Sequence, residues 1–221
     1  MFCRGMVAGA MMAGALLAPT CLYAQAFEGS ITMRMVSRGP QGAVSQVVEY
    51  LVRGGRMRVN MGGPMGGAAM IVSPAEKKLY MLLAAQNSYV EMSLPDSVAD
   101  QARTPAAAGA DSVKVTRTGR REQVAGMTCE HVLVNSRGAA TDLCLTRELG
   151  RFVSPMESLR AGTLAPWQRQ LGAEFPLKVT MADGSVPLEV TKVERKRLSN
   201  DLFAVPSSYT KVTMPPRRPP G

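Results

Sequence analysis

AVSQVVEYLVRGGRMRVNM, residues 43–61, is the stretch that decides the fold. Apolar and polar side chains alternate strictly along its second half, with Met57, Val59 and Met61 on one face and Arg56, Arg58 and Asn60 on the other. This period of two is typical of a β-strand with one buried face and one face in water. The Gly-Gly pair at 54–55 favours a tight hairpin turn. The stretch therefore predicts two antiparallel strands of one sheet.

Similar strand patterns continue on both sides of this hairpin, separated by turns rich in Gly, Pro, Asn and Asp. They predict further strands at 27–37, 68–73, 78–84, 87–94, 113–123, 126–135, 139–146, 174–183 and 185–196. The last two are joined by Asp183-Gly184, a strong hairpin dipeptide. Strands and helices do not alternate, so the pattern argues against a parallel α/β sheet.

One segment has a helical pattern. Ser154 is a suitable N-cap, Pro155 suits the first helical position, and Gly172 is placed to end the helix. Pro166 kinks or splits the segment. Its apolar residues recur at roughly helical spacing and comprise Met156, Leu159, Trp167 and Leu171. We therefore expect a mainly β (α+β) fold, in which a large curved antiparallel sheet or unclosed half-barrel is covered by a short helical segment.

The domain limits follow from composition. We expect a single β domain over residues 27–214, with a mobile loop near 100–112, where Ala, Gly and Pro dominate. The Pro/Arg-rich residues 215–221 are expected to form a disordered tail.

The first 26 residues have the pattern of a secretory signal peptide. Arg4 precedes an apolar run at 6–18, and Ala24-Gln25-Ala26 offers small residues for cleavage. A membrane anchor fits less well, because a spanning helix needs about 20 apolar residues. Acylation of Cys21 also fits poorly, since Pro and Thr precede it. We therefore expect a mature protein that begins near Phe27 and is periplasmic or secreted.

The formal net charge of +9 does not identify a partner. The basic residues are scattered or in short clusters without interleaved aromatic residues, which argues against a nucleic-acid partner. The charge is compatible with solvated strand faces and with peripheral attraction to a membrane of anionic lipid or to an anionic polysaccharide.

Both cysteines that follow the signal segment and the single histidine lie in TCEHVLVNSRGAATDLC, residues 128–144. If the turn centres on residues 136–137, Cys129 faces Cys144 and His131 faces Asp142 on the same side of the hairpin. Facing cysteines in an oxidising compartment normally form a disulfide. These four residues also have the ligand types of a zinc site, but a flat pair of strands converges poorly on a tetrahedron. The sequence predicts the disulfide, no metal, and a polar His131–Asp142 pair.

Other chemistry finds little support. A copper(I) site at Met57, Met61 and Met65 would have suitable thioethers, but Met57 and Met61 alternate as core residues do. The glycine-rich loop around Met65 lacks the Lys-Ser/Thr of a phosphate-binding loop. There is no G-x-S-x-G motif, and the acidic residues are spread along the chain. We expect no enzymatic activity and no cofactor.

The chain resembles a bacterial family of unknown function, DUF4412, over most of residues 27–214. The resemblance rests on YLVRGGRMRVNM (50–61), TGRREQVAGMTCEHVLV (118–134) and the ending FAVPSSY (203–209). That family is similar in outline to the LolA/LolB lipoprotein carriers, whose fold is an unclosed antiparallel barrel plugged by helices. The resemblance implies a half-barrel, while a shared fold does not by itself imply a shared function.

Two functions from different classes remain open. The first is a periplasmic carrier or binding module for an apolar or acyl ligand, or for a lipoprotein. Its expected ligand-binding residues are Met57, Val59, Met156, Leu159, Trp167 and Leu171, the last four forming a lid. The second is a structural or partner-binding protein of the cell envelope whose interior is filled core. A continuous apolar cavity favours the first, and a filled interior with an exposed apolar patch favours the second.

Overall fold

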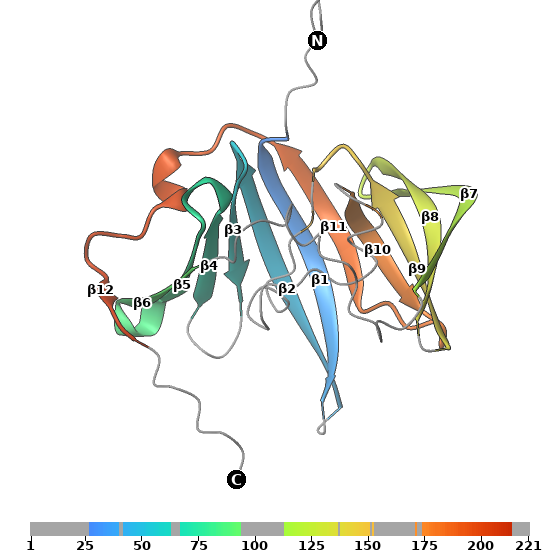
Figure 1. Cartoon of the computed structure of the whole chain (residues 1–221), viewed down its shortest axis with the longest axis horizontal. Helices are drawn as coiled ribbons and strands as arrows, with labels where there is room; N and C mark the ends of the chain where they lie inside the picture. Colours follow the sequence, from blue (N-terminus) through green and yellow to red (C-terminus); the bar gives the residue numbers. More distant parts are fainter. Residues whose placement is uncertain are drawn as a thin grey trace, which may run out of the picture.

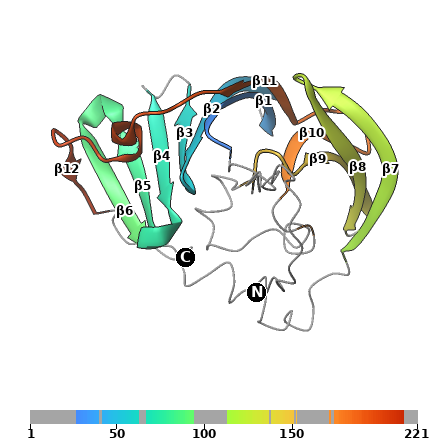
Figure 2. The ribbon, with the colours of Figure 1, turned by 90° about the horizontal axis from the view of Figure 1, so that it is seen from above.

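A computed structural model of the chain shows one sheet of twelve strands (Figure 1). The structure describes residues 27–39, 42–62, 67–93, 113–136, 138–150, 152, 171 and 174–213. Along the sheet the strands follow the order β12-β6-β5-β4-β3-β2-β1-β11-β10-β9-β8-β7. The sheet is strongly curved and open, with β12 near one end and β7 at the other (Figure 2).

Eleven of the twelve strands correspond to the strands that the sequence predicts. Their bounds are β1 Gly29–Gly39, β2 Gly42–Arg53, β3 Arg56–Met61, β4 Ala68–Ser73, β5 Lys78–Leu83, β6 Ser88–Ser93, β7 Lys114–Val124, β8 Met127–Ser136, β9 Ala139–Thr146, β10 Phe175–Met181, β11 Leu188–Arg195 and β12 Thr210–Lys211. The exception, β12, is two residues long and pairs with β6 in parallel. All other neighbouring strands are antiparallel, which confirms the predicted unclosed antiparallel sheet.

The two halves of the chain meet at β1, which pairs with β2 on one side and with the late strand β11 on the other. The β1–β11 pair requires close approach of the two backbones at Gly29. A Cβ atom there would lie 2.0 Å from the main-chain oxygen of Glu194, so no other residue fits without displacing the strand.

The outer, convex side of β2–β5 is covered by the C-terminal segment (red in Figure 2). Leu51 of β2 packs there with Leu198 and Phe203, and Phe203 ends a short 3₁₀ helix, η3 (Asn200–Phe203). Arg58 of β3 donates from Nη1 to the carbonyl oxygen of Leu202 at 3.0 Å, which fixes η3 against the same side.

The alternating residues of these strands therefore face the concave side, as the period of two requires. They belong to the main core and include Val48, Tyr50, Met57, Val59, Met70 and Val72, together with Ile31 and Met33 of the neighbouring strand β1. The predicted face of Met57 and Val59 is thus a core face of the sheet, and both residues are buried.

The expected covering helix finds no support. Of the predicted segment 154–172, only Leu171 lies within the described residues. In the described part of the chain, the residues in helical conformation are Leu171, the 3₁₀ helix η3, and two more 3₁₀ turns, η1 (Pro74–Glu76) and η2 (Ala84–Gln86). Among those same residues, no helix combines the length and apolar character needed to cross a membrane. The expected signal segment 1–26, the mobile loop 100–112 and the tail 215–221 also fall outside the described residues.

Glu91 of β6 fastens β12 to the sheet, and we expect this attachment to weaken in acid. The Glu91 carboxylate accepts hydrogen bonds from Lys211 of β12 (2.9 Å) and from Lys78 of β5 (3.1 Å). These bonds, with that of Lys211 first, lower the pKa of Glu91 below its ordinary value. A carboxyl group whose pKa is lowered by folding stabilises the folded state at pH values above its ordinary pKa. This contribution is lost as the pH falls through the pKa of the folded state.

Hydrogen exchange measures this attachment directly. The amides of Thr210 and Val212 donate to the carbonyl oxygens of Asn87 (2.9 Å) and Tyr89 (2.8 Å). Their protection factors, corrected for the intrinsic pH dependence of exchange, should fall on acidification. In the Glu91→Gln variant, these protection factors should already be low at neutral pH and should change little on acidification. Equal protection in both proteins at every pH would contradict this role of Glu91.

Candidate functional site

The Cys129–Cys144 disulfide is present, as the sequence predicts. It joins β8 to β9 with a Cα–Cα distance of 5.2 Å and closes a loop of 15 residues. The predicted register is wrong by two residues, because His131 faces Cys144 directly and Ser136 faces Ala139. The turn is centred later because Gly138 adopts φ +76°, a left-handed conformation that glycine takes at little cost. The disulfide and the His131–Asp142 contact are therefore diagonal pairs.

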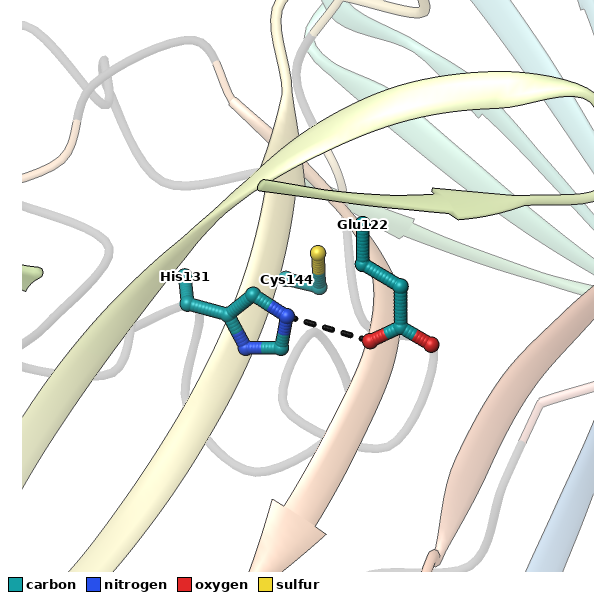
Figure 3. Close-up of side chains that lie close together, drawn as sticks. All are labelled: Glu122, His131 and Cys144. Carbon is teal, nitrogen blue, oxygen red and sulfur yellow. Dashed lines mark hydrogen bonds and ion pairs between the residues drawn. The ribbon is translucent and has the colours of Figure 1, made fainter. Parts of the chain in front are cut away.

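His131 lies between the carboxylates of Glu122 and Asp142, and Figure 3 shows the Glu122 side of this contact. Its Nε2 is 3.0 Å from Oε2 of Glu122, and its Nδ1 is 2.9 Å from Oδ1 of Asp142. The side chain is 7% exposed. Because carboxylate oxygens only accept, both contacts are hydrogen bonds when both ring nitrogens carry hydrogen. The ring is thus held at both edges.

Glu122 reaches this site from a third strand, β7. The β7–β8 register shifts between Arg117 and Arg121, where Gly119 adopts φ +73°. Beyond this irregularity Glu122 faces Cys129, so its side chain lies on the same face as His131 and the disulfide. Glu122 is not among the site residues predicted from the sequence. The available signal was its place on the neighbouring predicted strand, but its register with β8 could not be read from the pattern.

Two cations complete the site. Lys178 of β10 donates to Oε1 of Glu122 at 2.9 Å. This hydrogen bond is the largest cause that lowers the pKa of Glu122. Arg120 donates through Nη2 to Oδ2 of Asp142, and the same nitrogen lies 2.8 Å from Nδ1 of His131. In the disulfide form, the negative charges of the two carboxylates are therefore balanced by the positive charges of Lys178 and Arg120.

The arrangement offers ligand types for a metal ion. One ligand atom each from Glu122, His131 and Cys144 lies within 4.8 Å of the others. In the disulfide form the sulfur of Cys144 is already bonded to Cys129, so no thiolate is present. The predicted polar pair of His131 and Asp142 is confirmed by their hydrogen bond.

The family assignment rests on a match over residues 27–209 to the domain of unknown function DUF4412. The chain belongs to the DUF4412 family. No protein of curated function matches it.

Three solved structures that are similar to this DUF4412 chain share 11–15% identity with it. An uncharacterised conserved protein from Thermus thermophilus has 15% identity and a TM-score of 0.49, over 86% of this chain and 91% of the other. A LolA superfamily protein from Nitrosomonas europaea has 11% identity and a TM-score of 0.36, over 81% and 91% of the two chains. A putative outer membrane lipoprotein-sorting protein domain from Vibrio parahaemolyticus has 12% identity and a TM-score of 0.34, over 80% and 89%. Similarities this distant carry no argument about function.

The residues expected to bind an apolar ligand are brought together only in part. Met57 and Val59 lie in the main core of the DUF4412 domain. Leu171 is buried in a second cluster with Val132, Val134, Leu143 and Leu145. Val179 packs against both clusters and so links them. Met156, Leu159 and Trp167 lie outside the described residues.

A second charged cluster surrounds Glu174, directly before β10. Arg117 donates to both of its carboxylate oxygens (2.9 and 3.0 Å), and Arg147 donates to one (2.8 Å). The pKa of Arg117 is raised, with this pairing to Glu174 as the largest cause. Glu174 is buried, and a buried carboxylate requires such partners. Its partners are 57 and 27 residues away in sequence, so no local pattern could have revealed the cluster.

Proposed function

We propose that this chain is an exported, non-enzymatic carrier or binding module for an apolar or acyl ligand, which includes the acyl chains of a lipoprotein. The observation that carries the proposal is the concave face of an unclosed sheet, which is lined by apolar residues that include Met33, Met57 and Met70. Export rests on the signal-like residues 1–26.

Methionine side chains suit this task. They are unbranched, have three rotatable bonds and fill irregular gaps, so they can repack around a flexible chain at low cost. Met35, Met61 and Met92 also pack at the border of the main core. The sheet itself is open, because β7 and β12 end it without pairing with each other. A half-barrel of this kind can widen without breaking strand pairs.

Ligand entry requires movement, because the concave face is closed in this structure. Met33, Met70 and Val59 are 0–1% exposed. We propose that the predicted segment 154–172, with Met156, Leu159, Trp167 and Leu171 as its apolar stripe, is the lid that moves. Burial of Leu171 next to the strand residue Val132 supports this placement of the end of the segment.

The alternative is a structural or partner-binding envelope protein. The same burial favours it, because a face that is 0–1% exposed is what a filled core shows. The protruding β1–β2 hairpin (Figure 1) carries the exposed residues Val44 and Val47, which are 58% and 60% exposed and would suit a protein contact.

Trp167, the single tryptophan, allows a direct test. A fatty acid brominated on its chain should quench the Trp167 emission in a saturable way if the ligand enters beneath the lid. In the control Trp167→Phe/Val44→Trp, the reporter sits on the exposed hairpin, and quenching should be weak and linear in concentration. Equal, non-saturable quenching in both proteins would refute the carrier and leave the filled-core alternative.

A further inference from the structure

We infer that reduction of the Cys129–Cys144 disulfide converts the His131 site into a binding site for a zinc-class divalent cation. Its ligands are the two thiolates, Nε2 of His131 and Oε2 of Glu122. The inference does not depend on the proposed carrier function, because its ligands are groups of β7–β9 that would bind a cation, whereas the carrier would use apolar residues such as Met57 of β3. Cys129 and Cys144 nevertheless belong to the same core cluster as Met57.

The described donors already converge. Glu122, His131 and Cys144 present ligand atoms within 4.8 Å of one another, from three adjacent strands (Figure 3). In a tetrahedral zinc site with bonds of about 2.0–2.3 Å, ligand atoms lie roughly 3.3–3.8 Å apart. Small side-chain shifts therefore suffice. Glu122, which projects from the bent strand β7, removes the objection that two flat strands converge poorly.

The outer contacts that orient metal ligands are also in place. Oδ1 of Asp142 lies 2.9 Å from Nδ1 of His131 and accepts from it when that nitrogen carries hydrogen, while Nε2 faces Glu122. Metal-bound histidines commonly have such a carboxylate on the other nitrogen. Lys178 holds Oε1 of Glu122 at 2.9 Å, while Oε2 faces the ring. A cation between Nε2 and Oε2 would replace the hydrogen that they share.

Charge makes the site selective for the reduced state. With the disulfide intact, Glu122 and Asp142 are balanced by Lys178 and Arg120. A dithiol reductant transfers two electrons and two protons to the disulfide and is itself oxidised to a disulfide. When the cation binds, Cys129 and Cys144 release their two protons to solvent. The two thiolates then add two negative charges, which a divalent cation offsets.

The test is metal titration of the purified chain in both redox states. A phosphine reductant is used in vitro, and full reduction is confirmed by alkylation and mass measurement. The reduced protein should bind one Co²⁺, with a thiolate-to-cobalt absorption band that Zn²⁺ removes by displacement. The oxidised protein should show no such band.

Variants distinguish the full site from a bare pair of thiols. His131→Ala and Glu122→Gln should each weaken Co²⁺ binding by at least about tenfold, the lower limit seen when even outer-shell partners of a metal are removed. Glu130→Gln is the matched control. Glu130 lies on β8 next to Cys129, but its side chain is on the opposite face, near Arg117, and its loss should leave affinity unchanged.

Any of three binding results would overturn the inference: equal affinity in the two redox states, a reduced protein without the cobalt band, or wild-type affinity in both His131→Ala and Glu122→Gln. A fourth test applies to folding. If the reduced chain unfolds without metal, recovery of its far-ultraviolet circular dichroism on addition of Zn²⁺ supports the site, and failure to recover refutes it.

Discussion

Phe175→Ala is expected to lower the free energy of unfolding by about 3–5 kcal/mol, the usual cost of truncating a buried Phe. Phe175 is fully buried, and its ring lies edge-on to those of Tyr50 and Phe152, with centroid distances of 6.2 and 5.1 Å. Tyr50 belongs to β2 and Phe175 to β10, so the three rings join the two halves of the sheet. Urea denaturation followed by circular dichroism measures the effect.

The matched control is Val47→Ala, because Val47 is an exposed apolar residue of the same sheet. We expect it to change stability by less than about 0.5 kcal/mol, as surface substitutions usually do. A loss below about 1 kcal/mol for Phe175→Ala would show that the two halves are not joined through this aromatic cluster.

Removal of the disulfide by Cys129→Ala/Cys144→Ala is expected to cost about 3 kcal/mol in the chain-entropy model for a loop of about 15 residues. The closed loop has that length. Thermal or urea unfolding of the double variant against the oxidised wild type gives the value. Before that comparison, native protein should be treated with an alkylating agent without reductant. Labelling of both thiols would contradict the disulfide.

Much of the sheet could be predicted because its signals are local. The alternation of Met57, Val59 and Met61, and the Gly54-Gly55 turn, each lie within a few residues of sequence. The β2–β3 hairpin forms as expected, with Gly54 and Gly55 at φ +56° and +77°, the conformation of a tight hairpin turn. Pairing of β1 with β11 and of β12 with β6 depends on distant segments, and no single stretch shows it.

The candidate site was predictable in its residue types and not in its geometry. The disulfide could be predicted because the two cysteines lie on neighbouring strands. The predicted register was wrong by two residues, but cysteines at diagonal positions of a twisted hairpin are still close enough to be joined. Glu122 and Lys178 could not be placed, because irregularities in β7 and β10 decide which residues face the histidine.

The central claim is that the concave face accepts an apolar ligand, and native mass spectrometry tests it most directly. The chain should be expressed with its own first 26 residues, recovered from the periplasm without detergent and sprayed from a volatile neutral buffer. We predict a second species heavier than the bare chain by the mass of a fatty acid or phospholipid, which dissociates on collisional activation. As a control, an acyl-binding protein added to the same preparation should retain its lipid. Detection of the bare chain alone in such a preparation would contradict the carrier function and favour a filled core.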